Sequence, residues 1–189
     1  MKIVLASTNQ HKLKEIANVL TNCEIVSAAS VGFTDEVEET GETFLDNAFL
    51  KARAVARATG LPTLADDSGI CVAALNGAPG VHSARYSGGD MVANRKLLLQ
   101  NLRGVTDRQA KFVCVMALVL PDGREYTAIG ETSGYITEQE HGESGFAYDS
   151  VFFSDDLQKT FAEATPAEKN SVSHRGRALQ KIAQIVEKL

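Results

Sequence analysis

Two adjacent carboxylates beside an apolar run are the first feature of the sequence that could do chemistry. Asp66 and Asp67 stand in the segment 65–69, Ala-Asp-Asp-Ser-Gly, directly after a strand-forming stretch. Because successive side chains of an extended segment point to opposite sides, we expect one carboxylate to face a site and the other the scaffold. Carboxylate oxygens suit hard cations such as Mg²⁺. Asp, Ser and Gly are also common turn residues, so a structural turn remains an open alternative.

A polar segment between a predicted strand and a predicted helix is suited to an anion. Backbone N–H groups at the helix start, the positive end of the helix dipole and the Lys12 ammonium would together bind phosphate. No GxxxxGK[ST] or GxGxxG sequence is present, so neither a P-loop nor a dinucleotide-binding motif supports the site. Simple helix capping is the open alternative. The candidate residues are Ser7, Thr8, Asn9, Gln10, His11 and Lys12.

An acidic loop and a lysine on the helix that follows it add two more candidates. Glu39 lies in the segment 38–41, Glu-Glu-Thr-Gly, and could provide a further oxygen ligand or simply face solvent. Lys51 lies three residues after Ala48, on or beside the apolar face of the helix. From there it could reach into a cleft or extend along the surface into solvent.

Two segments in the C-terminal half could recognise a nucleobase. Residues 145–149, Gly-Phe-Ala-Tyr-Asp, combine rings that can stack on a base with a carboxylate that can accept its N–H groups. Core packing of Phe146 and Tyr148 is the alternative. Residues 168–175 concentrate hydrogen-bond donors before the last helix, which is informative in a chain of net charge −5, although a solvated basic helix start would also explain them.

Other kinds of site have little support. The four histidines do not stand at metal-ligand spacings, there is no G-x-S-x-G sequence, and the three cysteines lie in apolar runs. Their odd number and the lack of a CxxC spacing argue against a disulfide framework and favour a reducing compartment. The acidic balance argues against nucleic-acid binding. The apolar run at the N-terminus is too short for a signal peptide or a membrane span, so we expect a cytoplasmic protein that does not bind membranes.

The elements that must position these residues alternate between strands and helices. A chain of 189 residues fits one domain, and we expect a single domain over 1–189. Apolar periodicity predicts an α/β fold with a mixed, twisted central sheet flanked by helices. The predicted strands are 2–6, 23–28, 62–65, 70–75, 111–120, 125–132 and 135–137, with a loop over 35–42. The predicted helices start near residue 9, cover 43–59 and 90–102, and end the chain after a cap at Ser171 or Ser173.

Taken in order, six motifs resemble the inosine triphosphate pyrophosphatase family, also called XTP/dITP diphosphatases. The resemblance covers nearly the whole chain. The motifs are Ser7-x-Asn9-x-x-Lys12 and the segments 38–41, 65–69, 79–86, 145–149 and 173–176. The chain departs from many relatives at Ser7-Thr8-Asn9, where they have Thr-Gly-Asn, and at Ala147, where they have glycine.

The resemblance implies hydrolysis of ITP, dITP and XTP to the monophosphate and pyrophosphate, with Mg²⁺, commonly by a homodimer. It implies that Asp67 is the general base and a metal contact, and that Glu39 is a second metal contact. The substrate contacts implied, beyond residues 7–12, are Lys51, Ser68, Phe146, Ala147, Tyr148, Asp149, Lys169, His174 and Arg175. A Maf-like pyrophosphatase acting on modified pyrimidines and a nucleotide-binding regulator without catalysis are the alternative hypotheses.

Overall fold

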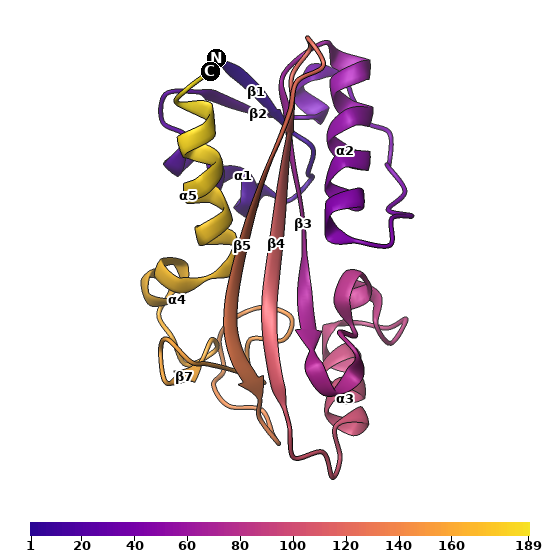
Figure 1. Ribbon diagram of the computed structural model, residues 1–189, viewed down its shortest axis with the longest axis vertical. Helices are drawn as coiled ribbons and strands as arrows, with labels where there is room; N and C mark the ends of the chain where they lie inside the picture. Colours follow the sequence, from indigo (N-terminus) through magenta and orange to yellow (C-terminus); the bar gives the residue numbers. More distant parts are fainter. The chain divides into compact units, whose positions relative to one another are not determined.

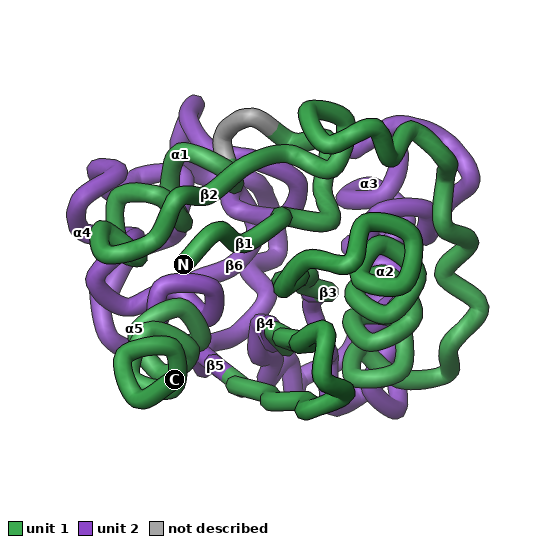
Figure 2. The backbone as a smooth tube through the Cα atoms, turned by 90° about the horizontal axis from the view of Figure 1, so that it is seen from above, with its two compact units in different colours: residues 1–67, 115–129, 178–189 green, residues 68–114, 130–177 purple. Residues whose placement is uncertain are grey.

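The computed structural model describes residues 1–9 and 12–189, and residues 10 and 11 only as part of a helix. The chain forms two compact units, which Figure 2 colours separately. Unit 1 contains residues 1–67, 115–129 and 178–189, and unit 2 contains residues 68–114 and 130–177. The single domain expected from the sequence stays a prediction.

Seven strands form one sheet in the order β2-β1-β3-β4-β5-β6-β7 (Figure 1). Strand β1 pairs in parallel with β2 and β3, whereas β6 pairs antiparallel with β5 and β7, so the predicted mixed sheet is confirmed. The strands are β1 (Lys2–Leu5), β2 (Glu24–Ser27), β3 (Thr63–Val72), β4 (Gln109–Val119), β5 (Glu125–Ile136), β6 (Phe152–Ser154) and β7 (Lys159–Thr160).

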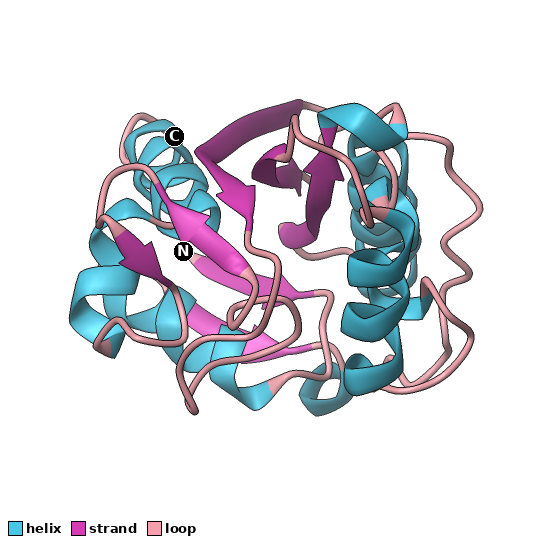
Figure 3. Cartoon of the chain, turned by 90° about the horizontal axis from the view of Figure 1, so that it is seen from below, coloured by secondary structure: helices cyan, strands magenta, loops and turns pink.

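Five α-helices and three 3₁₀-helices accompany the strands in the described part of the chain, and Figure 3 distinguishes helix, strand and loop. The helices are α1 (Gln10–Val19), α2 (Phe44–Thr59), α3 (Met91–Asn101), α4 (Pro166–Val172), α5 (His174–Val186), η1 (Ala29–Val31), η2 (Ala73–Leu75) and η3 (Gly80–Arg85). None of these helices has the length and apolar character needed to traverse a bilayer.

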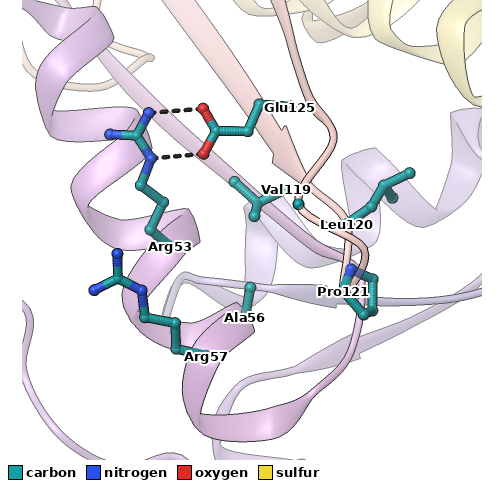
Figure 4. A pocket seen from close by; sticks show the side chains of 8 residues that line it. Arg53, Ala56, Arg57, Val119, Leu120, Pro121 and Glu125 are labelled. Atoms are coloured by element: carbon teal, nitrogen blue, oxygen red, sulfur yellow. Dashed lines mark hydrogen bonds and ion pairs between the residues drawn. The ribbon is translucent and has the colours of Figure 1, made fainter.

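Within unit 1, helix α2 packs through a stripe of small apolar residues. Ala48, Ala52 and Val55 recur at helical spacing and are buried, as the periodicity predicts. On another side of α2, Arg53 donates two hydrogen bonds of 2.7 Å to the carboxylate of Glu125 on β5, beside a shallow pocket of about 250 Å³ (Figure 4). These contacts fix the orientation of α2, which carries Lys51 and the residues around it.

Unit 2 has its own apolar core. Phe112 of β4 lies edge-on to Phe152 of β6, with ring centroids 4.7 Å apart, and stacks against Phe161 at 5.9 Å. Ile70 and Leu98 pack into the same cluster. Because the rings come from strands and from the loop after β7, this core fixes the segments on either side of the predicted base-binding loop.

The turn considered at residues 66–69 is wrong, because β3 runs without a break from Thr63 to Val72. Its carboxylates can lie inside a buried strand because each has a polar partner: Asp66 binds Lys12, and Asp67 binds Asn47. The strand predicted over 70–75 ends at Val72, where η2 begins.

The second predicted break, in the hairpin strand after residue 132, is also absent, since β5 continues to Ile136. Helix α4, strands β6 and β7 and the three 3₁₀-helices were not predicted from the sequence. The predicted loop over 35–42 is confirmed, and so is Ser173 as the cap of α5, where its Oγ accepts the Gly176 N–H at 3.0 Å.

Candidate functional site

A cavity of about 540 Å³ in unit 1 gathers residues that the sequence placed in different motifs. Ser7 and Thr8 line it after β1, and Lys12 lines it from the first turns of α1. Glu39 of the acidic loop and Lys51 of α2 line the same cavity. The structure therefore brings the predicted phosphate cradle together with the acidic loop and the α2 lysine.

The Lys12 ammonium is held by a buried carboxylate. Its Nζ lies 2.9 Å from both oxygens of Asp66, whose exposed fraction is 2%. Asn9 accepts the Lys12 backbone N–H at 3.4 Å, which agrees with its predicted capping of the helix. Asp66 is a site residue that the sequence analysis did not select, although its position next to Asp67 was the available signal.

Lys51 joins the acidic loop to β3. Its Nζ donates to Glu39 Oε1 at 2.8 Å and to the backbone carbonyl of Asp66 at 2.7 Å. The same ammonium thus contacts the predicted metal-binding loop and the peptide group that precedes Asp67.

Asp67 points to a different neighbour from Asp66, as strand alternation requires. Its Oδ2 accepts a hydrogen bond of 3.0 Å from Asn47 Nδ2. Asn47 is fully buried and its Oδ1 accepts the Gly41 N–H at 2.7 Å. Asn47 was not predicted as a site residue, because an asparagine inside a helix carries no local signal of a site.

The donor atoms around the acidic loop suit a hard divalent cation. Within residues 1–9 and 12–189, no group of three or more His, Cys, Asp or Glu gathers as a self-sufficient metal site. Glu39 and Asp67 nevertheless offer carboxylate oxygens: Glu39 binds the Lys51 ammonium, which also binds the carbonyl of the peptide that precedes Asp67. Mg²⁺ fits such a set, because it is usually held by one or two carboxylates and completes its shell with water and phosphate oxygens.

In unit 2, Asp149 organises the predicted base-binding loop. Its Oδ2 accepts the Phe146 N–H at 2.6 Å and the Lys169 ammonium at 2.5 Å. The side chain of Phe146 is 66% exposed, so it is not part of the core and presents its ring to solvent. The Asp149 carboxylate thus anchors the backbone of the loop, and the Phe146 ring is left exposed.

Tyr148 occupies the interior instead. Its hydroxyl donates to the Ser83 carbonyl at 2.6 Å, and burial raises the pKa of the phenol. The core-packing alternative thus describes Tyr148 and not Phe146. The predicted contact of Tyr148 with substrate stays a prediction.

Ala147 has an uncommon backbone conformation for a residue with a side chain. Its φ is +51°, in the left-handed region that glycine adopts most easily. Arg95 Nη1 donates to the Ala147 carbonyl at 2.8 Å, and Arg95 Nε pairs with Glu140 at 3.1 Å. This contact holds the peptide between Ala147 and Tyr148.

His174 and Arg175 begin α5, and both side chains are partly buried. The His174 ring stacks on Phe112, with centroids 4.8 Å apart and an interplanar angle of 13°. The imidazole orientation is therefore set by the core of unit 2.

The remaining predicted residues are simply located. Ser68 lies in β3 and is half-buried, and Asn9 is exposed. Gln10 and His11 lie outside the described residues. In the described part of the chain, the predicted metal contacts and the lysines Lys12 and Lys51 belong to unit 1. Ser68, the predicted base contacts and Lys169, which was predicted to contact phosphate or nucleotide, belong to unit 2.

Comparison with known proteins gives full-length matches. A model of the Ham1 family matches residues 3–185. A protein named dITP/XTP pyrophosphatase from Treponema denticola is 46% identical over 192 residues, covering 99% of each chain. One of the same name from Desulforamulus reducens is 49% identical over 196 residues, covering 100% of this chain and 97% of that one.

Solved structures share the fold. The Staphylococcus aureus Ham1 protein superposes with a TM-score of 0.95 at 39% identity, covering 100% of this chain and 99% of that one. The nucleoside-triphosphatase, or dITP/XTP pyrophosphatase, of Mycobacterium abscessus gives 0.84 at 48% identity, covering 96% of this chain and 98% of that one.

Proposed function

Because this chain belongs to the Ham1 family, we propose that it hydrolyses the non-standard purine nucleoside triphosphates dITP, XTP and ITP to the monophosphate and pyrophosphate. The observation that carries the proposal is the cavity of unit 1, where two lysines and the acidic loop meet beside the Asp66-Asp67 pair. Such a cavity suits a polyphosphate, which needs cationic groups and a place for a divalent metal.

The two lysines bind the phosphates in this proposal. Lys12 pairs with Asp66 and Lys51 with Glu39, so each ammonium has a fixed direction. Ser7 and Thr8 add hydroxyl and N–H donors at the edge of the cavity. A triphosphate of about four negative charges would thereby meet positioned donors and not mobile side chains.

Asp67 accepts the proton of the attacking water, and the bond between the α and β phosphates is broken. The oxygen that remains on the β phosphate leaves with pyrophosphate, and the hydroxyl of the water completes the monophosphate. Glu39 and Asp67 would hold Mg²⁺. When bound, Mg²⁺ offsets phosphate charge and polarises the phosphoryl oxygen, an effect worth several kcal/mol.

Base recognition falls to unit 2. Phe146 offers its exposed ring for stacking, and Asp149, which binds the Phe146 N–H and the Lys169 ammonium, holds the backbone of the loop. His174 and Arg175 supply donors for a 6-oxo group. A 6-amino group in its place leaves each buried donor unpaired, at a cost of roughly 1–3 kcal/mol, so adenine nucleotides are disfavoured.

The test is product analysis with purified protein, Mg²⁺ and a panel of dITP, XTP, dATP and dGTP. We expect pyrophosphate from dITP and XTP, with much slower release from dATP. Asp67→Asn should lose most turnover, whereas Asp122→Asn, on the β4–β5 turn, should keep it. Orthophosphate as the sole first product would contradict the cleavage position, and preferred cleavage of pyrimidine triphosphates would support the Maf-like alternative. Tight binding of ITP without hydrolysis would instead favour the regulator hypothesis.

We further propose that the protein works as one functional domain over 1–189, as a homodimer in the cytoplasm, on free nucleotides and not on nucleic acid or membranes. The net charge of −5 disfavours polyanion binding, and the odd number of cysteines, with no CxxC spacing, supports a reducing compartment. Light scattering after gel filtration tests the dimer, since a mass of one chain at micromolar concentration would contradict it.

A further inference from the structure

We propose that Asn47 is a positioning residue that fixes two proposed metal-binding groups relative to each other, the Asp67 carboxylate and the loop that carries Glu39. The inference rests on the proposed function for the identity of the metal ligands. It concerns a side chain that lies on neither the strand nor the loop that carries those ligands, but on the helix α2.

The Asn47 amide makes two directed hydrogen bonds within unit 1. Its Oδ1 accepts the Gly41 N–H at 2.7 Å, and its Nδ2 donates to Asp67 Oδ2 at 3.0 Å. A backbone N–H can only donate, so the amide oxygen must face Gly41 and the NH₂ group must face Asp67. The orientation of the amide is therefore settled by its surroundings, and it presents a donor to the carboxylate.

The environment of Asn47 makes these two bonds obligatory. Its side chain is 0% exposed, so water cannot replace either partner. A buried amide or carboxylate that lost its partner would bear the full desolvation cost. The Asp67 carboxylate is consequently anchored through one oxygen, which restricts the plane in which its other oxygen lies.

The same residue fixes the acidic loop. Residues 33–41 have no regular secondary structure, so side-chain contacts must set their path. At Gly41 there is no room for a side chain, since a Cβ would lie 2.6 Å from the Cβ of Asp46 and 2.7 Å from Asn47 Oδ1. Glycine alone lets the loop backbone approach Asn47 this closely, two residues after Glu39.

Helix α2 provides a rigid base for this bridge. Thr43 and Asp46 form a capping box at its first turn, and the Asn47 N–H donates to the Thr43 carbonyl at 3.2 Å. Asn47 thus sits on a fixed turn, with the loop on one side of its amide and β3 on the other. Residues that orient metal ligands in this way usually change metal affinity by 10- to 100-fold when removed.

The test is a titration of the protein with Mn²⁺ in the absence of substrate, in which electron paramagnetic resonance measures the concentration of the free ion. We expect Asn47→Ala to weaken Mn²⁺ binding by about 10- to 100-fold. The matched control is Asn94→Ala, because Asn94 is also buried in the first turn of a helix and bridges a loop, accepting from Ser87 and donating to the Ala84 carbonyl. Asn94→Ala should lose about as much thermal stability as Asn47→Ala, but its Mn²⁺ affinity should stay within about twofold of that of the unmodified protein.

A second variant covers the case in which Asn47→Ala does not fold. Gly41→Ala forces the loop away from Asn47, so it should weaken Mn²⁺ binding in the same direction. In the double variant with Asn47→Ala, it should reduce the Mn²⁺ affinity by less than a further factor of about two, because both changes remove the same contact. Unchanged Mn²⁺ affinity in Asn47→Ala or in Gly41→Ala, or equal losses in Asn94→Ala, would overturn the inference.

The proposed function is measured separately, as dITP hydrolysis by the unmodified protein. A protein that binds Mn²⁺ but leaves dITP intact would refute the proposed activity, and the Asn47 and Gly41 titrations would still decide the role of Asn47. A protein that does not bind Mn²⁺ would refute the role of Asn47, even if dITP were hydrolysed.

Discussion

Ala147, one of the positions at which the chain departs from the resembling motifs, has a strained backbone. Ala147 replaces the glycine of the resembling motif, and its φ of +51° explains why glycine suits this position. The loop keeps its shape because Arg95 binds the Ala147 carbonyl and Asp149 binds the Phe146 N–H. We therefore expect the Ala147 methyl group to lower the free energy of unfolding and to leave the path of the loop unchanged.

Ala147→Gly should raise the free energy of unfolding by up to about 1 kcal/mol. The left-handed conformation costs an alanine roughly 1–2 kcal/mol, and the greater freedom of glycine in the unfolded chain offsets about 0.4–1 of it. Ala58→Gly, at an exposed position of α2, should have the opposite effect and lower the free energy of unfolding by about 1 kcal/mol. Denaturant titration measures both, and a loss in both variants would contradict the strain argument.

The divergence of the two neighbouring carboxylates could be predicted from the sequence, because the alternation of side chains along an extended segment is a local rule. Asp66 and Asp67 indeed diverge, toward Lys12 and Asn47 respectively. The partners could not be predicted, since Lys12 lies 54 positions away in the chain and only the fold brings it to Asp66. The location of Phe146 at the surface and Tyr148 in the core was equally beyond the sequence, because both are aromatic residues in one loop.

Helix α2 shows what local sequence decides at the scale of elements. It was predicted over 43–59 and is found at Phe44–Thr59, because a capping box begins it and Gly60, in the left-handed conformation, ends it. Strand β3 shows the opposite, since turn-forming residues in its middle remain extended when the sheet and two polar partners hold them. Helix α4 was missed although Thr165, Pro166 and Glu168 carry the same capping signal.

Thr43→Ala should destabilise the protein by about 1 kcal/mol, because the capping box loses its hydroxyl acceptor. Thr59→Ala is the matched control at the other end of α2. Its hydroxyl donates back to the Val55 carbonyl inside the helix and accepts the Leu61 N–H at 3.3 Å, outside the helix, so its loss should cost less than the loss of the Thr43 hydroxyl. Thermal unfolding of both variants measures the difference, and equal shifts would argue against a specific role for the cap.

At the scale of the whole molecule, four solvent-accessible carboxylates are stabilised in their charged form, Asp122, Glu125, Glu163 and Glu168. The Arg124 side chain lowers the pKa of Asp122, and Arg53 lowers that of Glu125. The Thr160 N–H lowers the pKa of Glu163, and the Lys159 ammonium lowers that of Glu168 to about 2. A folded pKa below the unfolded value means that the stabilisation is present above the ordinary values of 3.8 and 4.5 and is lost as pH falls.

We therefore expect the melting temperature to fall progressively below about pH 4.5, toward the folded pKa values. Glu168→Gln cannot titrate, so its melting temperature should start lower at neutral pH and fall less in the acid range. Calorimetry of both proteins across this range measures the effect. A variant whose acid loss matched that of the unmodified protein would show that Glu168 does not contribute.

The exposed ring of Phe146 also makes the chain convenient for spectroscopy. The sequence contains no tryptophan, so Phe146→Trp would introduce the sole indole fluorophore at a side chain that is 66% exposed. Its emission would then originate in the 145–149 loop alone, and the arrival and departure of a purine could be timed by stopped-flow mixing without any external dye.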